Sequence, residues 1–225
     1  MVMFHVDESE DSKISQRFEG RVALYRRAGK RAFDVFLAVL LLPLIAPLVA
    51  VLWFVTTRDG GSGFFGHRRV GRNGKVFRCW KLRTMVVDAE QKLREHIRNN
   101  PEAAAEWAKD HKLNDDPRIT RLGRFLRKTS LDELPQIWNV LKGEMSFVGP
   151  RPVVRVELHK YGIHRPVYLS MTPGITGLWQ VSGRNDVTYS ERVQLDVDYS
   201  NDLSLLTDLR LIAMTGLSVV GATGR

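Results

Sequence analysis

The chain has 225 residues, of which 44% are hydrophobic and 26% charged, a composition that fits one folded domain with a sizeable core and excludes a disordered or fibrous protein. Its 34 Lys and Arg residues outnumber its 25 Asp and Glu residues, and the resulting charge of +9 indicates an anionic partner such as nucleic acid, an acidic membrane surface or a phosphorylated substrate. Cys79 is the only cysteine and the six histidines lack ligand spacing, which excludes an intrachain disulfide and a cysteine-based zinc site.

The amino-terminal part is polar, and its charge changes from acidic to basic along the chain. Residues 1–12 are acidic, and we expect them to be a disordered tail. Residues 13–34 are basic with apolar interruptions, a pattern typical of a helix that lies on anionic lipid. This basic helix leads into an apolar segment, and the two together form a membrane-associated unit over residues 13–57.

The apolar segment, residues 35–57, contains no charge, and as a helix it would reach about 34 Å, enough to cross a hydrocarbon core. Six basic side chains precede it within twenty residues and five follow it within twenty, so the positive-inside rule places both ends in the cytoplasm. Pro43 and Pro47 each remove a backbone donor on one helical face, which predicts a sharp bend. A re-entrant helix would place both basic flanks on the cytoplasmic side, and an ordinary kinked span is the alternative.

Residues 58–225 are expected to form a domain that is mainly α with a small β-hairpin, an α+β fold. Asn73-Gly74, between two runs that contain Val and Phe, predicts the hairpin. Residues 86–112 predict a charged helix that breaks before Pro101.

The carboxyl-terminal part carries a second set of local signals. Residues 173–185 hold too many turn formers to be regular. Thr188 followed by Glu191 is a capping box and predicts a helix through about residue 200. The apolar tail at 203–220 is interrupted by two charges, which favours an interfacial helix over a second span.

Asp132 and Glu133 stand where an amphipathic helix begins. The structural interpretation is a capping box, Ser130-x-x-Glu133, with both acids at a helix N-terminus. Pro135 fits the first turn if Asp132 is the N-cap, but costs a hydrogen bond if Ser130 is, so both starts stay open. The functional interpretation is that the helix N-terminus and nearby cations keep Asp132 ionised, as a nucleophile or metal ligand must be.

A dense set of basic residues supports the functional interpretation. If these side chains converge on the acid pair, they would hold a polyphosphate, with Mg²⁺ bridging it to the carboxylates. If they scatter, they form only a solvated surface. The set comprises Lys81, Arg83, Arg118, Arg121, Arg124, Arg127, Lys128 and Arg151.

Two further segments are candidates for the same site. Gly149-Pro150-Arg151-Pro152 holds an arginine between rigid residues, which prepares it for a bidentate phosphate contact. The same residues also fit a turn in which the arginine has no functional role. Trp179 and Arg184 could line a pocket, while Trp179 is equally typical of a core.

Six motifs, in this order, resemble the bacterial sugar transferase family, the small monotopic phosphoglycosyl transferases, over about residues 30–215. The likeness is greatest to enzymes that start exopolysaccharide synthesis with galactose-1-phosphate. One departure is Ala46-Pro47, where the family often has Ser-Pro. The motifs are KRAFD at 30–34, the Pro-bent segment, FRCWKLRTM at 77–85, LRKTSLDELPQ at 126–136, GEMSFVGPRP at 143–152 and PGITGLWQVSGRN at 173–185.

The resemblance implies a monotopic protein of the bacterial inner membrane, with a re-entrant helix and a cytoplasmic catalytic domain. It implies transfer of a sugar-1-phosphate from a UDP-sugar to a polyprenyl phosphate, with release of UMP and with Mg²⁺ present. By the same likeness Asp132 is the nucleophile and forms a phosphosugar-aspartyl intermediate, and Glu133 completes the pair. Lys81, Arg127 and Arg151 match positions expected to hold phosphates or the nucleotide, and Arg83 and Arg184 join this predicted binding set.

Three alternatives stay open at this stage. A membrane-anchored nucleic-acid binder would also be basic, but the acid pair would repel a nucleic-acid backbone, so we expect no nucleic-acid partner. A non-catalytic assembly protein of the same pathway would tolerate loss of Asp132. A homologue specific for UDP-glucose would share every motif. A homodimer is a further expectation, with the charged helix at 86–112 as its candidate contact surface.

Overall fold

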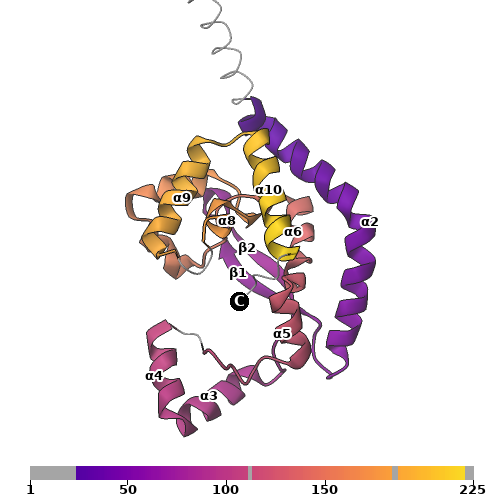
Figure 1. Cartoon of the computed structure of the whole chain (residues 1–225), viewed down its shortest axis with the longest axis vertical. Coiled ribbons are helices and arrows are strands. Elements are labelled where there is room, and N and C mark those ends of the chain that lie inside the picture. The colour runs from indigo at the N-terminus through magenta and orange to yellow at the C-terminus, as the bar shows by residue number, and fades with distance from the viewer. Residues whose placement is uncertain (1–23, 111–112, 184–186, 221–225) are drawn as a thin grey trace, which may run out of the picture.

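The computed structural model describes residues 24–110, 113–183 and 187–220. The predicted tail at 1–12, the part of the basic helix before residue 24, and Arg184 lie outside these residues. The described chain is mostly helical, with one long helix, α2, running along one side of the remaining elements (Figure 1). The predicted combination of helices with a small hairpin is confirmed.

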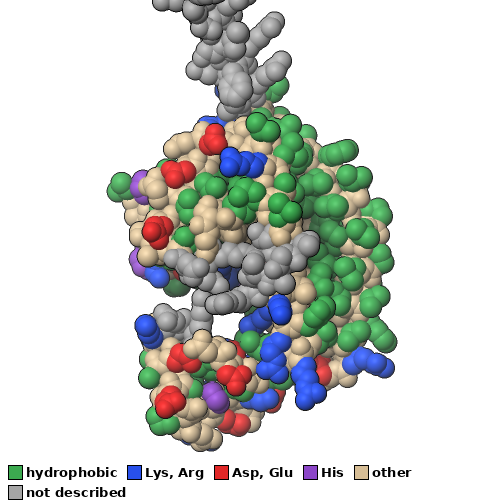
Figure 2. Space-filling model, viewed as in Figure 1, with side chains coloured by type: hydrophobic (Ala, Val, Ile, Leu, Met, Phe, Trp, Pro, Cys, Tyr) green, Lys and Arg blue, Asp and Glu red, His purple; other side chains and the backbone are tan. Residues whose placement is uncertain are grey.

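Helix α2 spans Lys30–Thr57 and follows a π-helical turn, η1, at Tyr25–Gly29. Pro43 and Pro47 lie inside α2, which keeps its helical assignment throughout but changes direction part-way along its length (Figure 1). Its outer face exposes large apolar side chains, and Figure 2 shows hydrophobic side chains gathered along this side of the molecule. Within the described ranges, one helix is long and apolar enough to cross a membrane, and it contains α2.

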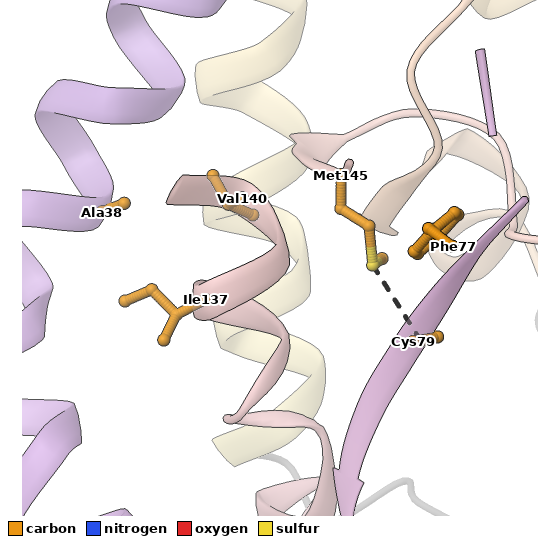
Figure 3. Close-up of a cluster of buried hydrophobic side chains, with 6 residues drawn as sticks. All are labelled: Ala38, Phe77, Cys79, Ile137, Val140 and Met145. Carbon is orange, nitrogen blue, oxygen red and sulfur yellow. Dashed lines mark hydrogen bonds between the residues drawn. The ribbon is translucent and has the colours of Figure 1, made fainter. Parts of the chain in front are cut away.

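The inner face of α2 packs against helix α6, which spans Gln136–Lys142. Ala38 of α2 joins Ile137 and Val140 of α6, and Phe77 and Cys79 complete the same buried cluster together with Met145 (Figure 3). Burying the larger of these side chains, such as Ile137, Phe77 and Met145, stabilises the fold by about 1.5–3 kcal/mol each. The inner face of α2 is therefore part of the domain core.

Buried polar contacts attach the first turns of α2 to the domain. The Asp34 carboxylate accepts hydrogen bonds from the Ser146 hydroxyl at 2.9 Å and the Phe147 amide at 3.0 Å. Lys30 donates to the fully buried Asp208 carboxylate at 2.7 Å, which also accepts from the Tyr199 hydroxyl. Charged groups this deeply buried need such partners, so the KRAFD motif acts here as a docking element.

The last turn of α2 is attached to the same domain by Arg83. Its guanidinium donates to the carbonyl oxygens of Thr56, Ser62 and Met85 at 2.6–2.9 Å and to both carboxylate oxygens of Asp59. These bonds use every donor of the guanidinium, so the geometry favours a structural role for Arg83 over the predicted phosphate contact. Both ends of α2 thus lie against one domain.

The predicted hairpin consists of β1 (Phe64–Val70) and β2 (Val76–Leu82) in antiparallel pairing. The turn between them, η2 (Arg72–Gly74), has positive φ at Asn73 and Gly74, as the Asn-Gly signal predicts. In this register Phe65 lies opposite Lys81 and His67 opposite Cys79, so these four side chains share one face of the hairpin.

The other elements are short helices and a second, two-stranded sheet. The break before Pro101 and the capping box at Thr188 are confirmed. The sheet is parallel, β3 with β4, and it corrects the expectation that residues 173–185 lack regular structure. The elements are α3 (Ala89–Asn99), α4 (Pro101–Asp110), α5 (Arg121–Lys128), η3 (Leu131–Glu133), β3 (Ser146–Val148), η4 (Arg155–His164), α7 (Arg165–Ser170), β4 (Gly174–Thr176), α8 (Leu178–Val181), α9 (Tyr189–Asn201) and α10 (Leu205–Val220).

The predicted tail helix is α10, which packs on α8, β3 and β4 through the buried Leu211. Its other side exposes leucines, of which Leu206 and Leu217 are about three-quarters exposed at 77% and 75%. The helix is amphipathic as expected, and its position at a membrane interface stays a prediction.

Candidate active site

Asp132 and Glu133 lie on a single 3-10 turn, η3, directly before α6. Pro135 is the N-cap of α6, and neither predicted start of the helix is correct. Ser130 adopts a left-handed conformation with φ of 56° and makes no capping bond through its side chain, so the proposed capping box does not form. The left-handed Ser130 turns the chain ahead of η3, and Pro135, which has no N–H to donate, stands where α6 begins. The turn leaves Glu133 free to contact β2 instead.

Lys81 of β2 is the cation that pairs with both acids. Its ammonium lies 2.6 Å from a Glu133 carboxylate oxygen and 3.8 Å from an Asp132 carboxylate oxygen. Asp132 is buried, whereas Glu133 and Lys81 are half-buried at the cavity wall. Lys81 therefore lies at the acid pair, as predicted.

Asn139 fixes β2 against α6 and so sets the distance between Lys81 and the acids. Its side-chain oxygen accepts from the Trp80 amide at 3.1 Å, and its side-chain nitrogen donates to the Arg78 carbonyl at 2.7 Å and to Glu144 at 2.6 Å. The fully buried Asn139 side chain thus makes the backbone hydrogen bonds that a neighbouring strand would otherwise make at this edge of β2. Sequence reasoning missed this residue, because an asparagine inside an amphipathic helix carries no local signal.

Arg127 of α5 approaches the acids from another side. A Cβ at Gly123 would collide with the Thr84 carbonyl oxygen, so only glycine lets α5 pack this closely on the segment after β2. One turn later, Arg127 donates to the Thr84 hydroxyl at 2.9 Å. It keeps further donors for a ligand and lines the cavity beside Asp132.

The electrostatic state of Asp132 differs from the expectation. Burial raises the pKa of the Asp132 carboxyl above the ordinary aspartate value, while Lys81 pulls this pKa down, Glu133 raises it and Arg127 lowers it. A hydrogen bond from the Asp132 backbone amide also lowers this pKa. Because α6 begins only after Pro135, the groups that favour the ionised carboxylate are Lys81, Arg127 and this amide.

Two adjoining cavities flank the acid pair, with volumes of about 600 Å³ and 250 Å³. Both are lined by Lys81, Arg127 and Glu133, so they meet at the Glu133 carboxylate, and Asp132 lines the larger one. The larger one also has an apolar wall that includes Phe65 and Val87. The smaller one contains Arg151. A charged centre between a polar cavity and a partly apolar cavity suits one polar, anionic ligand and one ligand with an apolar part.

Arg151 reaches the smaller cavity through close packing of two glycine-rich segments. A Cβ at Gly149 would collide with the Thr172 carbonyl, and one at Gly174 with the Gly149 amide. This contact explains why the GPRP and PGITG motifs need glycine at these positions. It also brings Arg151 to 5.6 Å from the centre of the buried Trp179 ring, so the pocket and core interpretations of Trp179 both hold.

Arg69 is a site residue that sequence reasoning missed. It lies on the same hairpin face as Phe65 and His67 and lines both cavities. Burial and then the neighbouring Arg151 lower the pKa of Arg69, and Glu157 at 3.7 Å is the acid paired with it. Arg69 and Arg151 both line the smaller cavity, and two guanidinium groups in one cavity suit an anionic ligand. Its signal in the sequence was the alternation along β1, which becomes readable only with the hairpin register.

The remaining predicted cations do not join the site. Arg118 pairs with Asp116 at 2.6 Å and stacks on Trp107. None of the four side chains in the following set lines either cavity: Arg118, Arg121, Arg124 and Lys128. Lys81 and Arg127 are the cations that act on Asp132, and Arg69 and Arg151 line the smaller cavity together with Glu133. Arg83 lines the larger cavity, but its donors are used by Asp59 and by backbone carbonyls.

The described residues contain no group of three or more His, Cys, Asp or Glu side chains that could cage a metal ion. Two adjacent carboxylates, Asp132 and Glu133, line the larger cavity. Mg²⁺ is commonly bound by one or two carboxylates together with substrate phosphates and water, so this donor set fits a magnesium ion that arrives with a phosphorylated substrate.

The geometry and the comparisons with known proteins agree on a family. A family model described as "Bacterial sugar transferase" matches residues 25–222. An "Undecaprenyl-phosphate galactose phosphotransferase" of Salmonella typhimurium is 51% identical over 195 residues, which is 87% of this chain and 41% of that protein. An "Exopolysaccharide production protein ExoY" of Sinorhizobium fredii is 51% identical over 187 residues, 83% of either chain. This chain belongs to the bacterial sugar transferase family.

A third relative differs in the sugar that its name states. The "UDP-glucose:undecaprenyl-phosphate glucose-1-phosphate transferase" of Escherichia coli K12 is 36% identical over 195 residues, 83% of this chain and 39% of that protein. The chain spans about two fifths of the length of this relative and of the Salmonella one, and most of the length of the Sinorhizobium one.

Proposed function

We propose that this protein transfers a sugar-1-phosphate from a UDP-sugar to polyprenyl phosphate, releases UMP and thereby starts the synthesis of an exopolysaccharide or another surface polysaccharide. The observation that carries the proposal is the buried Asp132 beside Glu133, faced by Lys81 and Arg127 in a cavity with one polar and one apolar side. The names of the Salmonella and Escherichia relatives state the same class of acceptor, undecaprenyl phosphate.

The first step is displacement at the phosphorus next to the sugar. An Asp132 oxygen attacks this phosphorus, its bond to the UMP oxygen breaks, and UMP leaves with the bonding electrons. Arg69 and Arg151 line the smaller cavity, where they would hold the nucleotide phosphate and balance the charge on the departing UMP. Lys81 and Arg127 favour the ionised carboxylate that this attack requires.

The second step returns Asp132 to its starting state. A phosphate oxygen of the acceptor attacks the same phosphorus, the aspartyl–phosphorus bond breaks, and the sugar diphospholipid is released. Glu133 lies beside the nucleophile and holds Lys81, which suits it to orient the acceptor phosphate. Mg²⁺, bound through Asp132 and Glu133, would supply charge neutralisation on the diphosphate.

The donor hexose is proposed from the relatives alone. Two relatives at 51–52% identity carry galactose in their names, and the one that names glucose is 36% identical. We therefore propose galactose-1-phosphate as the transferred group, with glucose-1-phosphate as the competing outcome.

We also propose that α2 is re-entrant and that the domain lies on the cytoplasmic side of the inner membrane. Three observations support this topology: basic residues flank both ends, Lys30 and Arg83 bind the two ends to one domain, and the apolar outer face of α2 is exposed. A helix that crosses the bilayer would separate its ends by about 30 Å of hydrocarbon, with one end on the far side from the domain.

The test is UMP release from the purified protein in lipid, with Mg²⁺, polyprenyl phosphate and a panel of UDP-sugars. We expect UMP with one sugar, and a loss of more than about a thousandfold in Asp132→Asn with an unchanged melting temperature. Asp115→Asn, at an exposed turn, is the matched control and should retain full activity. Folded protein that releases no UMP with any sugar, or an active Asp132→Asn variant, would overturn the proposal.

A further inference from the structure

An apolar groove of about 530 Å³ lies between the second half of α2 and α6. Its α2 side is lined by small and medium side chains that include Ala46, Val49 and Ala50. Closer to the start of α2, Ile45 packs against the core cluster at α6, and at the far end Trp53 stacks on Phe64 with ring centres 6.3 Å apart. The groove is thus bounded at both ends by side-chain contacts between α2 and the domain.

The groove and the active site occupy opposite faces of the same strand. Side chains alternate along β2, so Trp80 lines the groove whereas Lys81 faces the acid pair. Along the chain, Pro135 lines the groove two residues after Glu133, which lines the cavity. The charged site and the apolar groove are therefore separated by the thickness of one hairpin.

Phe64 and Phe65 join the two spaces around the start of β1. They are consecutive, so they point to opposite faces: Phe64 lines the groove and Phe65 lines the larger cavity. Both are partly exposed, at 37% and 53%. Phe65 continues into the apolar wall of that cavity, which includes Val87. Apolar side chains thus lie at the start of β1 on both faces of the hairpin, Phe65 in the cavity that holds the acid pair and Phe64 in the groove beside α2.

We propose that the groove between α2 and α6 binds the prenyl chain of the lipid acceptor, while its phosphate lies at Lys81 and Arg127. This assignment rests on the proposed function, which requires a substrate with an anionic head and a long hydrocarbon chain. Among the described residues that line the groove, only Lys142 carries a charge, so a hydrocarbon suits it and a sugar or nucleotide does not. Trp53 lines the groove and is 40% exposed, so in the proposed topology a hydrocarbon chain would enter from the exposed side of α2.

The test fills the groove and separates the two halves of the reaction. Ala46→Phe and Ala50→Phe place a ring in the groove, whereas Leu44→Phe and Val51→Phe place it on the exposed outer face of α2 as matched controls. Exchange of labelled UMP into UDP-sugar without acceptor reports the first step. KM for a long polyprenyl phosphate and for a short prenyl phosphate, too short to enter the groove, reports the acceptor.

We expect the groove variants to raise KM for the long acceptor about tenfold, a loss of about 1.4 kcal/mol of binding, with the short acceptor and the UMP exchange unchanged. The outer-face variants should resemble the wild type. An unchanged KM for the long acceptor, or an equal rise for both acceptors, would overturn the proposal and leave the groove to bulk lipid. Absence of UMP exchange in the wild type would instead refute the proposed function itself.

Discussion

Replacing Asn139 with leucine tests how strongly the fold depends on the side chain that holds β2 to α6. Leucine keeps the approximate volume but can neither accept from the Trp80 amide nor donate to the Arg78 carbonyl and Glu144. The two neutral bonds contribute about 1 kcal/mol each and the bond to the carboxylate about 2 kcal/mol. We therefore expect a loss of about 4 kcal/mol in the free energy of unfolding, because the Trp80 amide is left partly buried without a partner.

For a domain of this size, such a loss lowers the melting temperature by about 8–16 °C. The assay is thermal unfolding in detergent or lipid, with UMP release measured below the transition. Gln91→Leu, which removes an exposed hydrogen bond to Glu95, is the matched control and should change the melting temperature little. Because Asn139 also sets the distance from Lys81 to Glu133, activity should fall in the folded Asn139→Leu variant. A melting temperature within about 2 °C of the wild type would refute this reasoning.

Two further predictions concern pH and topology. Burial raises the pKa of Asp196, the hydrogen-bond acceptor of Tyr161, to about 7, so the folded state keeps a proton that the unfolded state loses above about pH 4. The free energy of unfolding should therefore fall by up to about 4 kcal/mol as the pH rises from about 4 to about 7. In melting curves, Asp196→Asn should flatten this pH dependence. An equal slope in both proteins would contradict the prediction. In the proposed topology both flanks of α2 face the cytoplasm, so a membrane-impermeant maleimide added to intact cells should label neither Ala28→Cys nor Ser62→Cys. The native Cys79 is buried and should give no background signal. Labelling of one variant alone would establish a crossing.

Local signals in the sequence predicted the elements whose stability is local. The Asn73-Gly74 turn, the break before Pro101 and the capping box at Thr188 all depend on backbone preferences within a few residues, and all three are present. The capping box at Ser130 failed partly because of contacts outside its own segment. Ser130 is left-handed, and the Glu133 side chain that would complete the box pairs with Lys81, fifty-two residues earlier.

The sequence by itself determined that the protein has an uncharged helix long enough for a membrane, a basic surround and an acid pair at a helix start. Only the tertiary structure decided which cations meet the acids. Arg83 and Arg118 are as basic as Arg127, but their guanidinium groups pair with Asp59 and Asp116, whereas Arg69 enters the site through the register of β1 with β2. The reason is physical: charge and hydrophobicity belong to each residue, whereas distance between charges depends on packing across segments far apart in the chain.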